Sequence, residues 1–274
     1  MESAMFNKKI GIIGCGNMGE AIFSRLARVM EKSTSLMVSE IDAVRRDVIQ
    51  SKYKIIVEID NNYLVKFSDV IIIAVKPQDF DKVLNQEVCC GVSKDKLVIS
   101  IAAGITIKHI EGVLGVDVPV IRVMPNMPAM IGEAISALSA GTTATKEHMD
   151  IAKLIFSTIG EVIEVDEKLI DAVTAISGSG PAYFFYLAEA LHQAAVKLGL
   201  DEEVAKRLVF RTAVGTAKLW EYLKDEPARI RQKVTSKGGT TEAAINVFEA
   251  KHLKKIISQG VAAAARRSKE LSRR

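Results

Sequence analysis

The chain has 274 residues, of which 49% are hydrophobic and 26% charged, and its formal net charge is +4. Such a composition is typical of a globular protein with one large domain or two ordinary ones. Much of the excess positive charge lies in residues 266–274 without interleaved aromatic residues, so a solvated helix end explains it better than a nucleic-acid surface does.

The three cysteines are Cys15, Cys89 and Cys90. An odd number with two adjacent members suits neither a disulfide framework nor the spacing of a zinc site. The first seven residues lack the apolar core of a signal peptide, and no apolar run reaches the length of a membrane span. We therefore expect a protein of a reducing compartment, the cytoplasm.

The first 125 residues alternate between short β-branched runs and stretches with helical periodicity, such as 18–30 and 43–52. Runs that are apolar on both faces predict parallel strands buried in a sheet, and the alternation predicts right-handed βαβ units. The expected strands are 9–13, 36–39, 54–57, 70–75, 97–101 and 118–123.

The pattern changes at Pro125 and Pro128, which prevent a helix from continuing. The stretch 134–140 is expected to be an edge strand, and 146–159 a helix. Beyond residue 168 the pattern is helical, over 181–198, 202–223, 241–249 and 252–267. We predict an α/β domain over 1–164 and an all-α domain over 165–274. The alanine-rich faces of the second domain favour oligomerisation.

Three glycines, Gly14, Gly16 and Gly19, follow the first expected strand and open the first expected helix. In this context G-x-G-x-x-G is the fingerprint of a Rossmann-type doubly wound sheet that binds a dinucleotide. The first glycine makes the tight turn, the second clears the pyrophosphate, and the third lets helix and strand pack closely. A glycine-rich turn without a ligand is the structural alternative.

The second strand is followed by Glu40, a residue type that binds a ribose 2′-hydroxyl and favours NAD. The nearby Arg45, Arg46 and Ser39 leave NADP possible, so the sequence predicts NADPH or NADH without deciding between them.

Two further loops, 74–80 and 100–106, follow strands of the same sheet and should lie at the same crevice. The small residues Ala102, Ala103 and Gly104 make room for a flat ring. Lys76 is either a catalytic cation or a solvated loop residue.

A second candidate site lies in the helical half, where Gly238 and Gly239 precede Thr240 and Thr241 at a helix start. Free N–H groups and hydroxyls, including that of Ser236, suit a small carboxylate. A well-capped helix start is the alternative. The segment 177–183 places a proline at the start of the next expected helix, and Ser179 is a candidate cap for that helix.

The four histidines are scattered and show neither metal-ligand spacing nor a Ser-His-Asp arrangement, so no metal is predicted. The segment 180–189 also lacks the lysine expected in a hydroxyacid dehydrogenase. A substrate that already carries a protonated C=N group needs less acid catalysis, which favours an imine reductase.

Several segments together resemble the pyrroline-5-carboxylate reductases: IGIIGCGNMGEAI, AVKPQDF, SIAAGITI, VIRVMPNMPA, DAVTAISGSGPAYFF and VTSKGGTTEAAI. The resemblance covers nearly the whole chain and implies reduction of 1-pyrroline-5-carboxylate to L-proline by NADPH or NADH. It also implies a homodimer formed by the helical domain, with five dimers assembled into a decamer.

Site residues follow from the same resemblance. The cofactor would contact Ile13, Gly14, Cys15, Gly16, Asn17, Met18, Ser39, Asn61, Ala74, Val75, Lys76, Pro77, Ala102, Ala103 and Gly104. The substrate would contact Gly239, Thr240, Thr241, Ser236 and Glu167. Thr241 would act in catalysis by hydrogen-bonding the ring nitrogen. The chain departs from the family at Lys237, where proline is usual, and at Glu40-Ile41, where an arginine often follows the serine.

Other functions remain open at this point. Another small reductase of the same two-domain build, a hydroxyacid dehydrogenase or an F420-dependent reductase, would share the first domain. A dinucleotide-sensing protein without turnover would share it too, but would not need a second anion site.

Overall fold

The computed structural model describes residues 8–30, 35–115 and 117–272. The predictions for the first seven residues and for the end of the basic tail, residues 273–274, concern residues outside these ranges. The contacts divide the chain into two compact units, Met1–Ser179 with Ala264–Arg274, and Gly180–Ala263. The expected domain boundary at residues 164 and 165 stays a prediction.

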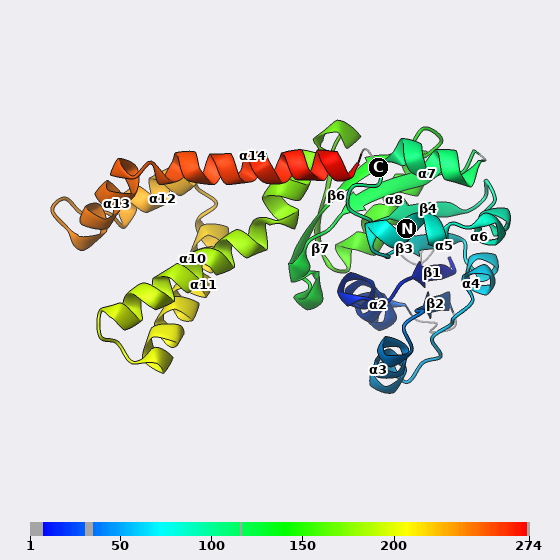
Figure 1. The fold of residues 1–274 in the computed structure, drawn as a ribbon, viewed down its shortest axis with the longest axis horizontal. Helices are drawn as coiled ribbons and strands as arrows, with labels where there is room; N and C mark the ends of the chain where they lie inside the picture. The colour runs from blue at the N-terminus through cyan, green and yellow to red at the C-terminus, as the bar shows by residue number, and fades with distance from the viewer. Residues whose placement is uncertain (1–7, 31–34, 116, 273–274) are drawn as a thin grey trace. The chain divides into compact units, whose positions relative to one another are not determined.

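The first unit contains a seven-stranded sheet in the order β2-β1-β3-β4-β5-β6-β7 (Figure 1). Its strands are β1 (Ile10–Ile13), β2 (Leu36–Ser39), β3 (Val70–Ile73), β4 (Leu97–Ser100), β5 (Val120–Met124), β6 (Ala134–Ala140) and β7 (Gly160–Glu164). Strands β2 to β5 form a parallel sheet with β1, whereas β6 runs antiparallel to β5 and β7 runs parallel to β6. The expected doubly wound sheet is confirmed.

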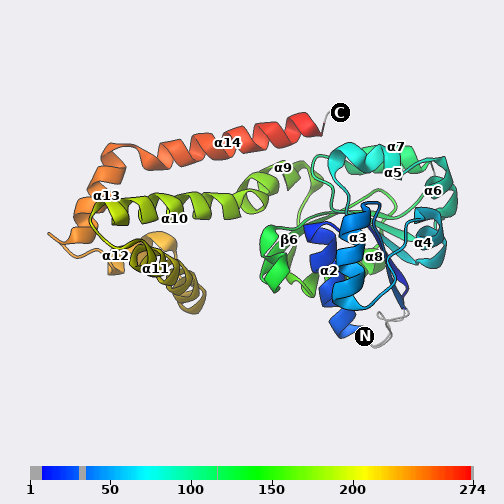
Figure 2. The same cartoon turned by 60° about the horizontal axis from the view of Figure 1, so that its bottom comes forward.

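Helices cover both faces of this sheet (Figure 2). One layer consists of α2 (Asn17–Val29), α3 (Ala43–Tyr53) and α8 (Lys146–Ser157). The other consists of α4 (Asn61–Phe67), α5 (Phe80–Val83), α6 (Gln86–Gly91) and α7 (Ile107–Leu114). Successive strand residues contribute to opposite layers, as Ile12 and Ile13 do, because side chains alternate along a strand.

Two expectations about strands were wrong, and one strand was missed. Segment 54–57 forms no strand: Lys54 turns the chain at the end of α3 with φ 56°, and only Glu58 makes a bridge, to Ser39. Val57 in this segment is buried at 4% exposure, whereas Ile56 is 79% exposed, so the run is only partly buried and lies outside the sheet. Strand β6 is not an edge strand, because β7 pairs with its outer side. The sequence did not reveal β7, which carries Glu161 and Glu164 on a largely exposed edge.

The second unit is helical, as expected. It contains α10 (Gly180–Lys197), α11 (Glu202–Leu223), α12 (Pro227–Lys233), α13 (Thr240–Ala250) and the first part of α14 (Leu253–Leu271). α10 and α11 lie side by side in both ribbon views (Figures 1 and 2).

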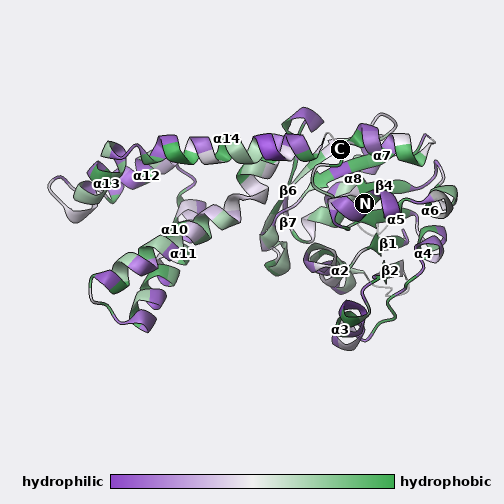
Figure 3. Cartoon of the chain, in the orientation of Figure 1, coloured by the Kyte–Doolittle hydropathy of each residue, from purple (hydrophilic) through white to green (hydrophobic). Residues whose placement is uncertain are grey.

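Hydrophobic residues recur along the ribbons of α10 and α11 (Figure 3). Large apolar side chains are exposed on these helices, among them Phe184 at 70%, Tyr186 at 75% and Tyr222 at 83%. This extent of exposed apolar surface is typical of a protein–protein interface. None of the described helices combines the length and apolar character needed to cross a bilayer.

Within the first unit, α8 is followed by β7 and then by the short helices η4 (Glu167–Leu169) and α9 (Ile170–Val173). A π-helical turn, η5 (Thr174–Gly178), continues from α9. Ser179 then has right-handed helical dihedral angles, so it does not act as the extended N-cap that the sequence suggested.

Candidate functional site

The glycine loop lies between β1 and α2, and each of its glycines has a distinct geometric reason. Gly14 has φ 92°, a conformation that favours glycine. A Cβ on Gly19 would lie 2.1 Å from the carbonyl oxygen of Gly14, so only glycine allows helix and strand to approach this closely. A Cβ on Gly16 would meet no atom within 4 Å and would project into open space.

Gly16 is also the N-cap of α2, and no side chain caps this helix. Its first N–H groups and the positive end of its dipole therefore suit an anion such as a pyrophosphate. Gly16 and Asn17 are exposed, whereas Cys15 is fully buried. The loop fits a dinucleotide: the space that a side chain at Gly16 would fill is left to the ligand.

Strand register brings the other predicted cofactor residues to the same edge of the sheet. Ile13 is level with Ser39 on β2 and with Ile73 on β3, and Ile73 is level with Ser100 on β4. Loops 74–77 and 102–104 therefore follow neighbouring strands at their carboxyl ends, where open α/β sheets bind ligands. A Cβ on Gly14 would lie 2.9 Å from the carbonyl oxygen of Ala74.

The residues of these two loops differ in exposure. Lys76 is exposed and precedes the short helix η2 (Pro77–Asp79), whereas Ala102 and Gly104 are buried. Gly104 has φ 76°, and a Cβ there would lie 2.9 Å from the Cβ of Leu271 near the end of α14. The sequence did not reveal this contact, because it joins residues far apart in the chain.

Ser39 and Asn61, both predicted to contact the adenosine side of the cofactor, are hydrogen-bonded to each other. The Ser39 hydroxyl donates a hydrogen bond to Asn61 Oδ1 at 2.7 Å, and Ser39 is only 1% exposed. Asn61 is the first residue of α4, and the Asp60 side chain caps that helix.

A network of charged groups borders the glycine loop. The carboxylate of Glu20, in the first turn of α2, accepts hydrogen bonds from Arg45, from Lys52 at 2.6 Å and from Tyr53 at 2.8 Å. Partial burial alone would raise the pKa of Glu20, but the hydrogen bonds from Lys52, Tyr53 and Arg45 together lower it below its ordinary value.

The buried thiol of Cys15 is not suited to act as a nucleophile. Burial raises the pKa of Cys15 to about 12, and the nearby Arg45 offsets this only in part. A thiol with such a pKa is protonated near neutral pH, and only the thiolate reacts readily.

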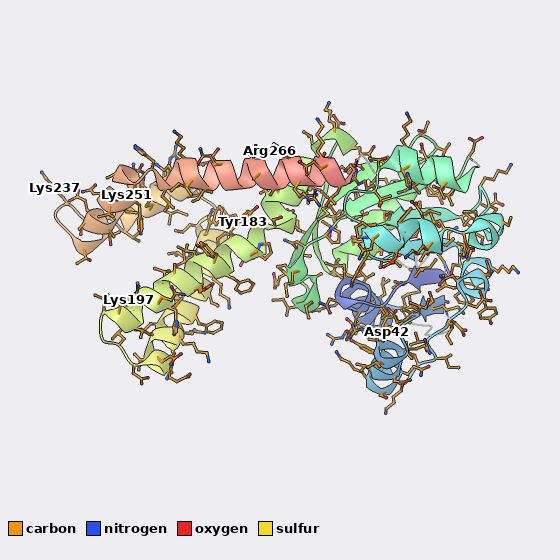
Figure 4. All side chains as sticks on the ribbon, in the orientation of Figure 1. Asp42, Tyr183, Lys197, Lys237, Lys251 and Arg266 are labelled. Carbon is orange, nitrogen blue, oxygen red and sulfur yellow. The ribbon has the colours of Figure 1, made fainter. Side chains whose placement is uncertain are left out.

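The second predicted site is a loop of the helical unit, between α12 and α13 (Figure 4 labels Lys237 at its tip). Gly238 has φ 73°, and its N–H donates to the Glu242 carboxylate at 2.7 Å. Gly239 is the N-cap of α13, and no side chain caps this helix either. A Cβ on Gly239 would lie 2.4 Å from the Ser236 hydroxyl, so glycine permits the close approach of that residue.

The hydroxyl-bearing residues of this loop differ in exposure. Ser236 and Thr240 are exposed, and Thr241, in the first turn of α13, is half-buried. The Gly239 N–H already donates to the Ser236 carbonyl oxygen at 3.1 Å. The N–H groups at the start of α13, beside the hydroxyls, are the donors that a small carboxylate needs. The predicted roles of Gly239, Thr240, Thr241 and Ser236 stay predictions.

Glu167 lies in the first unit and holds a buried cation. Its Oε1 accepts hydrogen bonds from the Ile107 N–H at 2.7 Å and from Arg122 at 3.0 Å. Arg122 is only 4% exposed. Glu167 thus ties the start of α7 to β5, and its predicted contact with substrate stays a prediction. In the described ranges, no cluster of three or more His, Cys, Asp or Glu side chains could hold a metal ion.

Two family models match the chain. Residues 167–271 match the family model for pyrroline-5-carboxylate reductase dimerisation, and residues 9–104 match that for the coenzyme F420-dependent NADP oxidoreductases. The chain therefore carries a dimerisation domain, which supports a homodimer and agrees with the exposed apolar faces of α10 and α11.

Full-length relatives give the same result. The pyrroline-5-carboxylate reductase of Synechocystis sp. is 41% identical, over 97% of this chain and 99% of that protein. The corresponding protein of Arabidopsis thaliana is 39% identical, over 96% of this chain and 95% of its own length.

Two solved structures share the whole fold. A pyrroline-5-carboxylate reductase from Coxiella burnetii has a TM-score of 0.89 at 36% identity and covers 97% of this chain and 98% of its own. Pyrroline carboxylate reductase from Plasmodium falciparum, a structure with NADP bound, has a TM-score of 0.87 at 30% identity and covers 98% and 99%. Because such similar relatives span nearly all of both units, the chain belongs to the pyrroline-5-carboxylate reductase family, whose members are NAD(P)-dependent oxidoreductases.

Proposed function

We propose that this protein reduces 1-pyrroline-5-carboxylate to L-proline with NADH or NADPH, the last step of proline biosynthesis. One observation carries the proposal beyond family membership. Both α2 and α13 begin at a glycine N-cap without a side-chain cap, and a glycine with positive φ precedes each, Gly14 at 92° and Gly238 at 73°. Two such helix starts suit two anionic ligands, a pyrophosphate and a carboxylate.

In this proposal the cofactor lies along the carboxyl edge of the parallel strands. The N–H groups of the loop around Gly16 bind the pyrophosphate, and Ser39 and Asn61 contact the adenosine side. Residues 74–77 and 102–104 line the nicotinamide side, where Ala102 and Ala103 leave room for the ring. The bound dinucleotide supplies a hydride from the nicotinamide C4 atom.

The loop before α13 binds the substrate in the same proposal. The Thr240 N–H and the Ser236 hydroxyl hold the carboxylate beside Gly239, whose own N–H donates to the Ser236 carbonyl oxygen at 3.1 Å. Thr241 hydrogen-bonds the ring nitrogen. The imine carbon accepts the hydride, and the nitrogen keeps its proton and becomes the secondary amine of proline. Because the protonated imine is already electrophilic, the protein acts by alignment, which lowers a barrier by about 7–11 kcal/mol in favourable cases. Glu167 is a further, weaker substrate candidate.

The test is a steady-state assay with the purified chain, followed by the loss of absorbance of the reduced nicotinamide. We expect turnover of 1-pyrroline-5-carboxylate and none of a 2-keto or 3-oxo acid. Turnover of an oxo acid alone would identify a hydroxyacid dehydrogenase. Binding of NADH without turnover of any imine would identify a dinucleotide sensor, and either outcome would reject the proposal.

We further propose that the homodimer assembles into a decamer and that the protein acts in the cytoplasm. The exposed apolar side chains of the second unit support self-association, and the described cysteines are all free, which suits a reducing compartment. Light scattering after size-exclusion chromatography tests the first proposal, since a mass of two copies at micromolar concentration would reject the decamer.

A further inference from the structure

A carboxylate is fixed directly beside the glycine loop. Glu40 follows the last residue of β2, and its Oε2 accepts the Cys15 N–H at 2.8 Å. Its Oε1 accepts the Asp42 N–H at 3.0 Å. Asp42 in turn caps α3, with its carboxylate accepting the Arg45 N–H at 2.8 Å (Figure 4 labels Asp42). Two backbone hydrogen bonds therefore hold Glu40 in one position at the crevice instead of leaving it to solvent.

The residue at this position helps a dinucleotide site to distinguish NAD(H) from NADP(H), which carries an additional 2′-phosphate. An acidic side chain at the end of the second strand accepts the 2′-hydroxyl of the adenosine ribose. A carboxylate offers about four lone-pair sites, so after accepting two N–H groups Glu40 can still accept a hydroxyl. A 2′-phosphate in the same place would put a second anion against it.

The nearby arginines could offset that repulsion only if they were free to turn toward a phosphate. Arg45 Nε donates to the carbonyl oxygen of Cys15 at 2.7 Å, and its Nη2 pairs with the Glu20 carboxylate. Arg46 Nη1 donates to the carbonyl oxygens of Glu40 at 2.9 Å and Ile41 at 3.2 Å. Both guanidinium groups are thus engaged with backbone oxygens or with another carboxylate.

Ser39 is similarly engaged. Its hydroxyl, a neutral group that could donate to a 2′-phosphate, donates to Asn61, and the residue is buried. We infer that Glu40 makes this enzyme favour NADH over NADPH. The inference rests on the proposed function only for its effect on turnover, because nucleotide binding can be measured without substrate.

The experiment compares nucleotide binding to the full-length protein by fluorescence titration with NADH and with NADPH. We expect the wild-type protein to bind NADH at least about tenfold more tightly, the effect of placing like charges in contact. Glu40→Gln keeps the size and one acceptor oxygen but removes the charge, and we expect it to reduce this ratio about tenfold or more, chiefly through tighter NADPH binding. Titrations with 5′-AMP and 2′,5′-ADP, which lack the nicotinamide, should give the same order.

Glu58→Gln is the matched control, because Glu58 pairs with Ser39 and its substitution removes a negative charge as Glu40→Gln does. We expect it to leave the ratio unchanged. Glu40→Ser provides a second test if Glu40→Gln is unstable. Raising the ionic strength should also weaken the discrimination, since exposed charges are screened.

Three outcomes would overturn the inference: a wild-type protein that binds NADPH as tightly as NADH, a ratio unchanged in both Glu40 variants, or a ratio changed equally by Glu58→Gln. These outcomes are separable from failure of the proposed function. A protein that prefers NADH in binding but does not reduce 1-pyrroline-5-carboxylate would reject the function and support the inference. A protein that reduces 1-pyrroline-5-carboxylate but binds NADPH more tightly would support the function and reject the inference.

Discussion

The Glu242 carboxylate accepts a hydrogen bond from the Gly238 N–H at 2.7 Å, which ties the loop before α13 to the first turn of that helix. Gly238 stands at φ 73°, a conformation that glycine adopts without steric cost. The bond orders the N–H groups that the proposal assigns to the substrate carboxylate, but it also places a negative charge near that anion.

Two variants separate these effects. Glu242→Ala removes both the bond and the charge, and we expect the KM for 1-pyrroline-5-carboxylate to rise about 3- to 10-fold, the worth of one hydrogen bond. Glu242→Gln keeps an acceptor oxygen without the charge, and its KM should stay the same or fall. Steady-state kinetics at saturating NADH measures both. Equal increases in the two variants would contradict this expectation, because Glu242→Gln keeps an acceptor for the Gly238 N–H.

Thr241 is the residue that the proposal places against the ring nitrogen. We expect Thr241→Ala to lower kcat/KM about 10- to 1000-fold, because a donor or acceptor aligned with the reacting group is lost. Thr241→Ser keeps the hydroxyl and should retain most of the activity. NADH binding, followed by fluorescence, should be unchanged in both variants. Full activity of Thr241→Ala would remove Thr241 from the mechanism.

Glu167 neutralises Arg122, which is only 4% exposed, and fixes the start of α7. We expect Glu167→Ala to lower the free energy of unfolding by about 1–3 kcal/mol, because it leaves a buried guanidinium without its carboxylate. Urea denaturation measures this loss, and an unchanged midpoint would contradict it. The KM of the folded variant tests the predicted substrate contact separately.

His148 connects pH to the stability of α8. Its Nδ1 accepts the Thr145 N–H at 3.0 Å and completes a capping box at the start of the helix. Partial burial lowers the pKa of His148; the neighbouring Glu147 opposes this effect, and Lys8 adds to it. The folded state therefore binds this proton less readily than the unfolded chain does, and protonation abolishes the acceptor.

The stability that neutral His148 contributes is accordingly present above its unfolded pKa of about 6.5 and is lost as pH falls through the lower folded value. We expect wild-type protein to lose stability relative to His148→Gln on acidification below about pH 6.5, because glutamine forms the same box without titrating. Thermal unfolding of both proteins from pH 8 to pH 5 measures the difference. A constant difference across that range would contradict the assignment.

The cysteines should differ sharply in reactivity. Cys90 is exposed, whereas Cys15 is buried and has a pKa raised to about 12. With a thiol-specific disulfide reagent at pH 8, we expect rapid labelling of Cys90 and labelling of Cys15 only after unfolding. Cys90→Ser should remove the fast phase. Rapid modification of Cys15 in the native protein would show that the glycine loop opens.

Many features of this fold can be predicted from residues that are close together in the sequence. Buried strands β1 to β5 show as apolar runs, the helices of the second unit show as long periodic stretches, and Gly14, Gly16 and Gly19 show by their spacing. These features depend on residues close in the chain, where side-chain periodicity and backbone freedom act directly. The pairing of β7 with β6 was not visible, because Glu161 and Glu164 on an exposed edge give no apolar pattern.

The tertiary structure alone decided which partners the charged groups around the glycine loop acquire. The sequence left NADH and NADPH open, since Glu40 favours NADH whereas Arg45 and Ser39 are compatible with NADPH. Only the fold brings Glu20 to Arg45, Asn61 to Ser39 and the Cys15 N–H to Glu40. Hydrogen bonds act over about 3 Å, and sequence position does not determine which groups come that close.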